Sequence, residues 1–133
     1  MDPNMIIKAA QQARLKAYAP YSQFLVGAAV LSASGKIVTG CNIENASYGL
    51  SMCAERTAIF KAISEGKSNL DRRFTAVAIV ADQADPTFPC GACRQVLAEF
   101  CTAETRLFLA DIKGDYVEYT LGELFPHPFG LAK

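Results

Sequence analysis

Apolar residues recur along the first half of the chain with two different spacings, which predict alternating helices and strands. The first pattern predicts a helix over residues 3–18 that Asp2 can cap. Two apolar runs follow at residues 25–31 and 36–43, and the short turn "SASG" between them predicts an antiparallel hairpin. Helical spacing returns over residues 53–66, where a glycine ends the pattern.

The second half of the chain continues this alternation and closes with another hairpin. Residues 74–81 form a near-continuous apolar run, typical of a strand buried on both faces, and residues 90–101 are the next predicted helix. Strands over residues 106–111 and 116–119 are expected to pair antiparallel, because the turn "IKGD" is too short for a parallel crossover. The sequence "TLGE" at residues 120–123 is a capping-box signature that predicts a short last helix.

This order of elements, αββαβαββα, predicts an α/β fold. Helices that connect strands lie on the faces of the sheet, so both faces are expected to be covered. We therefore expect a three-layer α/β/α sandwich with a mixed five-stranded sheet. The chain of 133 residues has no linker and no internal repeat, which predicts a single domain over residues 1–133.

Composition and charge limit which binding partners and which cellular compartment are expected for this chain. Thirteen basic residues balance thirteen acidic ones without a Lys or Arg run, so nucleic acid is not an expected partner. The longest apolar run, "FLVGAAVL", is too short to cross a bilayer, and the N-terminus lacks a signal-peptide pattern. We expect a cytoplasmic protein without a membrane partner. Its five cysteines then favour metal binding or catalysis over disulfides.

Three of the cysteines lie where predicted helices begin. Cys53 opens one helix, and Cys90 and Cys93 open the next. A helix N-terminus presents free N–H groups and a partial positive charge, which favour the thiolate that binds metal. Both helices follow strands, so their starts are expected at the carboxyl edge of the sheet, where open α/β sheets bind ligands. Three thiolates on Zn²⁺ leave one tetrahedral position for a water.

Three other interpretations of these cysteines remain, and the plainest is that Cys90 and Cys93 are buried thiols without a ligand. A structural zinc site would need a fourth protein ligand, and the candidates are Cys41, Cys101 and His127. Cys41 lies inside a strand and Cys101 lies far along the helix, so neither is well placed. His127 lies between two prolines in a tail whose position the sequence leaves open. A redox pair at Cys90 and Cys93 is the third alternative, but the tryptophan that usually precedes such a motif is absent.

Glu55 favours a catalytic site. It lies two residues after Cys53, in the first helical turn, close to the expected metal without being its natural ligand. A carboxylate there can take a proton from a zinc-activated water and pass it to a substrate atom. This combination of cysteine ligands and a glutamate is that of the zinc deaminases. The plainer alternative is a surface acid favoured by the helix dipole.

The segments "CAERTA", "PCGACRQVL" and "NIENASYG" together resemble the cytidine deaminase family, specifically its small homotetrameric zinc-dependent type. The resemblance covers most of the chain. It implies hydrolysis of cytidine and 2′-deoxycytidine to uridine and 2′-deoxyuridine with release of ammonia, a step of pyrimidine salvage. It also implies one Zn²⁺ per subunit, held by Cys53, Cys90 and Cys93, with Glu55 as the proton shuttle.

The resemblance also implies residues that bind the nucleoside. Asn42 and Glu44 resemble the pair that holds the ribose 3′-hydroxyl, and Phe24 resembles the ring that stacks on the base. Ala54 is a further substrate-binding position, and Arg56 resembles a residue that offsets the charge of the thiolates. The plainer alternatives are a core aromatic, solvated polar residues at a strand end, and a surface ion pair.

Three further positions are implied to act between subunits of a homotetramer. Ala46 and Tyr48 match positions that reach a neighbouring subunit's site. The tail "LFPHPFG" resembles the family's ending and would make Phe129 the aromatic that covers a neighbour's pocket. His127 and Pro128 replace small spacer residues there, so this part of the resemblance is less typical, and Phe129 as a core aromatic is the alternative.

Two rival functions remain open on the sequence. One is deamination of another cytosine nucleoside, such as blasticidin S, which the segment "NIENASYG" and Arg56 disfavour. The other is a non-catalytic zinc-binding module with a fourth protein ligand. A polynucleotide-editing deaminase is disfavoured, because the chain is neutral and the "IKGD" hairpin leaves no helix between the last two strands.

Overall fold

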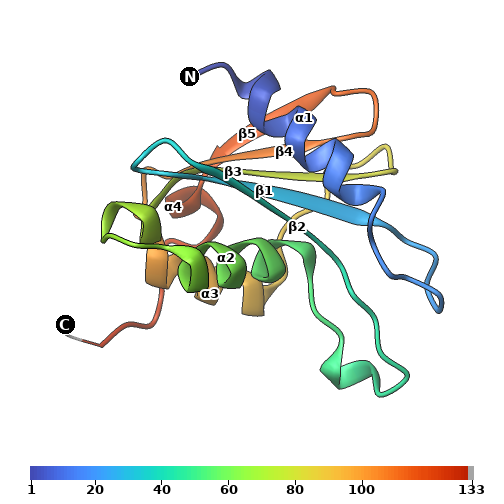
Figure 1. The fold of residues 1–133 in the computed structure, drawn as a ribbon. Coiled ribbons are helices and arrows are strands. Elements are labelled where there is room, and N and C mark those ends of the chain that lie inside the picture. Colours follow the sequence, from blue (N-terminus) through green and yellow to red (C-terminus); the bar gives the residue numbers. More distant parts are fainter. Residues whose placement is uncertain (132–133) are drawn as a thin grey trace.

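The computed structural model describes residues 1–131, in which a five-stranded sheet carries helices on both faces (Figure 1). The strands are β1 (Val26–Ser32), β2 (Ile37–Cys41), β3 (Phe74–Ala81), β4 (Arg106–Ala110) and β5 (Tyr116–Thr120). The helices are α1 (Pro3–Arg14), α2 (Ala54–Glu65), α3 (Gly91–Phe100) and α4 (Leu121–Leu124), with single 3₁₀ turns η1 (Tyr48–Leu50) and η2 (Leu70–Arg72). The predicted order of elements is confirmed.

The sheet is mixed, as predicted. Its strand order is β2-β1-β3-β4-β5. The hairpins β1–β2 and β4–β5 are antiparallel, and β1 also pairs antiparallel with β3. The β3–β4 pair is parallel, because α3 carries the chain back between them. Strands β2 and β3 therefore run in the same direction, and their carboxyl ends meet at one edge of the sheet.

The helices divide between the two faces of the sheet, which gives the predicted three layers (Figure 1). Helix α1 covers one face, where Ile6, Ile7 and Ala10 pack against alternate residues of β1, β3 and β4. Helices α2, α3 and α4 cover the other face with a larger cluster that includes Ile59, Leu97 and their strand neighbours. Strand β3 is buried on both faces, as expected for a strand in the middle of such a sandwich.

Two glycines allow the helices to lie directly on the strands. A Cβ atom on Gly40 of β2 would lie 2.4 Å from the backbone nitrogen of Ala58 in α2. A Cβ atom on Gly27 of β1 would lie 2.0 Å from the carbonyl oxygen of Ala10 in α1. Only hydrogen fits at these contacts. The contact at Gly40 fixes α2 against β2, and thereby places the start of α2 at the carboxyl end of that strand.

The first helix and the second strand are shorter than predicted. Helix α1 ends at Arg14, and not at residue 18, because Tyr18 leaves the helix and donates its N–H to the carbonyl of Asn42. Strand β2 ends at Cys41, and not at residue 43, because Ile43 pairs with Tyr18 and Met52 outside the sheet. The residues released from both elements form the loops beside the candidate site.

The predicted helix starts are confirmed. The Asp2 carboxylate accepts a hydrogen bond from Asn4 N at 3.0 Å, and Thr120 and Glu123 form the predicted capping box.

Within residues 1–131, no helix combines the length and the apolar character that a membrane span requires.

Candidate active site

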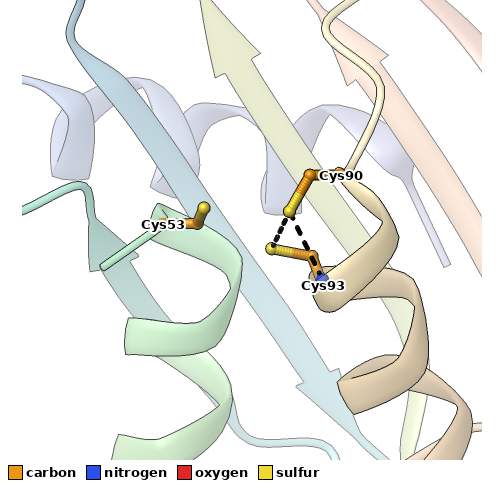
Figure 2. A group of neighbouring side chains, drawn as sticks. All are labelled: Cys53, Cys90 and Cys93. Atoms are coloured by element: carbon orange, nitrogen blue, oxygen red, sulfur yellow. Dashed lines mark hydrogen bonds between the residues drawn. The ribbon is translucent and has the colours of Figure 1, made fainter. Parts of the chain in front are cut away.

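The three cysteines predicted to meet do so at the starts of two helices. Cys53 is the N-cap residue of α2, Cys90 is the N-cap residue of α3, and Cys93 lies in the first turn of α3. Their sulfur atoms all lie within 4.8 Å of one another, and the Sγ atoms of Cys90 and Cys93 are 3.4 Å apart. Figure 2 shows the sulfurs of Cys90 and Cys93 directed into the space between the helices, toward Cys53.

This thiol cluster fits a zinc ion. A hydrogen bond from Cys93, together with the charge and hydrogen bond of Arg56, lowers the pKa of Cys53 to about 5, so a thiolate is already favoured at neutral pH. Thiolates within this spread suit the tetrahedral geometry of Zn²⁺. Within residues 1–131, the cluster contains three ligand atoms and none from Cys41, Cys101 or His127. The donor set is therefore that of an open site and not of a closed structural one.

Arg56 is directed at the thiols. Its Nη2 atom donates to Cys53 Sγ at 3.4 Å, and neither of the two ion pairs found in residues 1–131 involves it. Its Nε atom is buried and has no hydrogen-bond partner among the described residues. The hydrogen bond to Cys53 raises the pKa of the guanidinium further, so its positive charge stays beside the sulfurs. This geometry argues against the surface ion pair that was the alternative.

Glu55 is buried beside the thiol cluster. Its side chain belongs to the first turn of α2 and the residue is only 5% exposed, so it is not a solvated helix acid. Burial raises the pKa of its carboxyl group above the ordinary value. This upward shift favours the protonated carboxyl group more than in a solvated glutamate, which is the direction that a general acid–base group needs.

The thiol cluster opens into a pocket of about 370 Å³. Cys53, Ala54 and Glu55 line one end, where α2 begins. Asn42 and Glu44, from the segment after β2, line the pocket as well. The pocket therefore joins the metal-type cluster to two side chains with free capacity to bind hydroxyl groups.

Glu44 and Asn42 are held by hydrogen bonds to the loop before β1. Glu44 is only 8% exposed, and its carboxylate accepts hydrogen bonds from the backbone N–H groups of Tyr21 at 3.0 Å and Ser22 at 3.1 Å, and from the Ser22 hydroxyl. The Ser22 hydroxyl is the largest of the causes that lower the pKa of Glu44. Asn42 accepts from Val26 N at 2.8 Å. Both polar side chains are thus fixed and not freely solvated.

Each of these two side chains keeps part of its hydrogen-bonding capacity. A carboxylate offers about four acceptor positions, and the described residues fill three of those on Glu44. The amide of Asn42 uses one of its two N–H donors on the carbonyl of Phe24, at 2.8 Å. One acceptor and one donor thus stay available to a ligand.

Phe24 lines the pocket and is partly exposed, which does not fit a core aromatic. Tyr48 is 70% exposed and lines the rim of its own chain's pocket. Ala46 is exposed and does not line it. Phe129 is 71% exposed and also lies outside it, with its carbonyl held by Gln95 Nε2 at 2.9 Å. The roles of these residues between subunits stay predictions.

Six pocket-lining residues were not predicted as site residues, namely Ser22, Val26, Ser51, Met52, Thr87 and Phe88. Thr87 and Phe88 line the pocket just before the Pro-Cys step that opens α3, and Ser22 lines it two residues before Phe24. The available signal was their nearness in sequence to a metal-ligand candidate and to the candidate stacking ring.

A larger hollow, of about 720 Å³, lies at the opposite edge of the sheet around Phe74, Phe100 and Cys101. Burial raises the pKa of the Cys101 thiol to about 12, so this sulfur stays protonated. The metal-type cluster identified in residues 1–131 borders the 370 Å³ pocket through Cys53 and Cys90. Size alone therefore does not identify the reactive site.

The chain is similar to known proteins along almost its whole length. The family described as "Cytidine and deoxycytidylate deaminase zinc-binding region" matches residues 2–109. A cytidine deaminase of Halalkalibacterium halodurans is 56% identical over 129 residues, which are 97% of this chain and 95% of that protein. The crystal structure of a cytidine deaminase from Burkholderia pseudomallei superposes with a TM-score of 0.89 at 46% identity, covering 97% of this chain and 100% of that one.

A blasticidin-S deaminase of Bacillus cereus is a more distant relative, 32% identical over 108 residues, or 76% of this chain and 74% of that protein. The matched region 2–109 includes all three clustered cysteines and Glu55. The resemblance inferred from the sequence motifs is confirmed. This chain belongs to the family of deaminases defined by the cytidine and deoxycytidylate deaminase zinc-binding region.

Proposed function

We propose that this protein is a zinc-dependent hydrolase that converts cytidine and 2′-deoxycytidine to uridine and 2′-deoxyuridine with release of ammonia. One observation carries the proposal: a single pocket is lined by Cys53 and Cys90 of the thiol cluster, by the buried Glu55, and by the polar pair Asn42 and Glu44. A nucleoside has a base to react and a sugar to hold, and this pocket offers groups for both. The name of the 56% identical relative supports the same substrate.

At the thiol end, Cys53, Cys90 and Cys93 would hold the zinc ion, which supplies Lewis-acid activation of water at neutral pH. The Glu55 carboxylate accepts a proton from the water that attacks C4 of the base. It then delivers that proton to the leaving amino group, which departs as ammonia. The Arg56 guanidinium beside Cys53 offsets the negative charge of the thiolates.

At the other end, Asn42 and Glu44 hold the ribose through its 3′-hydroxyl. A hydroxyl both donates and accepts, and the free acceptor on Glu44 and the free donor on Asn42 match it. Phe24 stacks on the base, and Ala54, at the buried start of α2, lines the pocket where the base lies. Fixing the sugar places C4 of the base at the thiol end, which is the orientation the reaction needs.

The test is conversion of cytidine by the purified protein, followed as loss of the cytosine absorbance and release of ammonia. We expect rapid conversion that a strong zinc chelator abolishes and added Zn²⁺ restores. Folded protein that holds one zinc per chain and does not convert cytidine would contradict the proposal. The same assay with 2′-deoxycytidine tests the second substrate.

Blasticidin S is the rival substrate within the family. Identity to the blasticidin-S deaminase is 32%, against 56% to the cytidine deaminase, so the sequence favours cytidine. Parallel assays with both nucleosides decide this point, and preferential turnover of blasticidin S would overturn the assignment. Cobalt substitution separates both from a non-catalytic zinc module, since four protein ligands and no exchangeable water would indicate the module.

We also propose that the protein is a cytoplasmic homotetramer in which neighbouring subunits complete each site through Ala46, Tyr48 and Phe129. The strong exposure of the two aromatic rings supports this, because large aromatic side chains are usually buried in a protein's core or in an interface. Cytoplasmic thiols stay reduced, which suits a cluster that needs free cysteines. Light scattering that reports a monomer would contradict the assembly.

A further inference from the structure

Ser22 connects two residues that the proposed function assigns to substrate binding. Its hydroxyl donates a hydrogen bond to the Glu44 carboxylate, and the same oxygen accepts one from the backbone N–H of Phe24 at 3.0 Å. Its own N–H donates to the other carboxylate oxygen of Glu44 at 3.1 Å. Ser22 therefore contacts the candidate ribose ligand and the candidate stacking residue at once.

The backbone around Ser22 makes this double contact possible. Gln23 lies in the left-handed region, with a φ of 57°, and its N–H donates to the carbonyl of Ala19 at 2.9 Å. Such a conformation is uncommon for residues other than glycine and costs free energy. It turns the chain between Ser22 and Phe24, so both can face the pocket that they line. The carbonyl of Phe24 is then fixed by Asn42 Nδ2 at 2.8 Å.

We propose that Ser22 is a positioning residue for nucleoside binding, whose hydroxyl holds the Glu44 carboxylate and the Phe24 backbone in the arrangement that receives the sugar and the base. This inference rests on the proposed function of the same pocket. Ser22 itself does not touch the reacting atoms. Its hydroxyl and its N–H fill two of the acceptor positions of Glu44, and with the N–H of Tyr21 in a third, about one position is left for a ligand.

A purely structural role for Ser22 would predict a loss of stability when its hydroxyl is removed, whereas the positioning role predicts a loss of substrate binding. Ser22 is exposed, so loss of its hydroxyl opens no core cavity, and the two backbone N–H groups still hold Glu44 in place. Stability should therefore change little. What changes is the precision with which the carboxylate and the ring meet the substrate, which affects binding before it affects the chemical step.

The first experiment compares Ser22→Ala with Ser22→Thr, which keeps the hydroxyl, and uses Ser64→Ala on the exposed face of α2 as the control. We expect Ser22→Ala to raise KM for cytidine about tenfold, as loss of one hydrogen bond to a charged group implies, with kcat nearly unchanged. Ser22→Thr should restore KM, and Ser64→Ala should match the unmodified enzyme. With 3′-deoxycytidine the effect of Ser22→Ala should be smaller, because the contact through Glu44 is already absent.

The second experiment does not depend on turnover. Carbon-13 NMR of the zinc-loaded enzyme without nucleoside follows the titration of the Glu44 carboxyl group. We expect its pKa to lie below the ordinary glutamate value, to rise in Ser22→Ala, and to stay low in Ser22→Thr.

The two experiments separate failure of this inference from failure of the proposed function. An unchanged KM for cytidine in Ser22→Ala overturns the positioning role, as does a Glu44 pKa at or above the ordinary value in the unmodified enzyme. The Glu44 pKa of the unmodified enzyme can be measured without any variant. It can therefore still contradict the inference if Ser22→Ala does not fold. An unmodified enzyme that does not deaminate cytidine overturns the proposed function and the substrate-binding role together, whereas the titration still decides whether Ser22 holds Glu44.

Discussion

The two ends of the pocket each contain one buried glutamate, and the two environments shift their pKa values in opposite directions. Glu55, at the thiol end, is 5% exposed, and burial raises the pKa of its carboxyl group. Glu44, at the other end, is 8% exposed, and three hydrogen bonds lower the pKa of its carboxyl group. The exposed fractions are similar but the surroundings differ: burial is the largest cause of the shift at Glu55, and the Ser22 hydrogen bond is the largest cause at Glu44.

This contrast distinguishes a carboxyl group that moves a proton from one that holds a ligand. A raised pKa makes the protonated form of Glu55 more accessible than in a solvated glutamate, in the direction that a proton shuttle requires. A lowered pKa keeps Glu44 ionised as a constant acceptor for hydroxyl groups. A proton shuttle needs burial that hydrogen bonds do not offset, whereas a carboxylate that holds a ligand needs hydrogen bonds that offset its burial.

The largest expected effect is the loss of the proton shuttle. Glu55→Gln keeps the shape of the side chain and removes its ability to accept a proton, so kcat should fall by about 10³-fold or more. The zinc content, measured by metal analysis, should stay at one per chain because the three cysteines are unchanged. A variant that turns over at the unmodified rate would show that the proton moves elsewhere.

A smaller effect, on a different kinetic parameter, is expected at the other end of the pocket. Glu44→Gln replaces an ionised acceptor that is fixed by three donors, so KM for cytidine should rise by about 10- to 100-fold with a modest loss in kcat. The measurement is steady-state kinetics beside Glu55→Gln. A variant of Glu44 that loses kcat and keeps KM would place both glutamates in the chemical step and remove the contrast.

The fold and the thiol end of the site could be predicted because both follow from local patterns. Helical and strand spacing gave the order of elements, and two short turns gave both antiparallel hairpins. Cys53, Cys90 and Cys93 lie at helix starts, and helix starts that follow β2 and β3 meet at one edge of the sheet. These predictions were possible because they concern regular helices and strands, which follow from local spacing.

The loops at the other end could not be predicted in the same way. The hydrogen bonds of Glu44 reach back 22 and 23 residues to Ser22 and Tyr21, and nothing in the local spacing of either segment indicates this pairing. The helix predicted to reach residue 18 stops at Arg14 for the same reason, since Tyr18 pairs with the chain after β2. Contacts between two irregular segments depend on tertiary structure and override local propensity.

A third buried carboxylate tests whether a lowered pKa by itself indicates ligand binding. Asp71 is 5% exposed and accepts hydrogen bonds from Ser34 Oγ at 2.5 Å, Lys67 N at 2.9 Å and Lys36 Nζ at 3.2 Å. These bonds hold its pKa well below the ordinary range, and they join the β1–β2 turn to the segment before β3. Asp71 therefore has the chemistry of Glu44 but does not line the pocket beside the thiol cluster, and its role is expected to be structural.

Asp71→Asn should lower the melting temperature by about 5 °C at pH 7 and leave KM for cytidine unchanged. Because the pKa is lowered in the folded state, the stabilisation is present above the unfolded pKa of about 4 and is lost as pH falls below it. The difference in melting temperature from the unmodified protein should therefore narrow below about pH 4. The exposed Asp82→Asn is the matched control, and a changed KM in Asp71→Asn would extend the ligand-binding network to the far side of the molecule.

The smallest effect is expected where a carboxylate has a good partner but remains in water. Glu118 forms a bidentate ion pair with Arg106, in which Nε–Oε2 is 2.7 Å and Nη2–Oε1 is 3.2 Å. Both side chains are nevertheless about 40% exposed. Solvent screens such a pair and the ordering of two long side chains opposes it, so Glu118→Gln should lower the melting temperature by less than about 2 °C.

High salt should reduce the effect of Glu118→Gln further, whereas the effect of Asp71→Asn should persist because that carboxylate is buried. Melting curves of both variants at low and high ionic strength make the comparison directly. Equal losses in the two variants would mean that hydrogen-bond geometry alone sets the strength of these carboxylate contacts. Burial would then no longer explain why Glu44 and Asp71 are held so firmly. The opposite pKa shifts at the two ends of the pocket would then have to be explained by the thiol cluster beside Glu55.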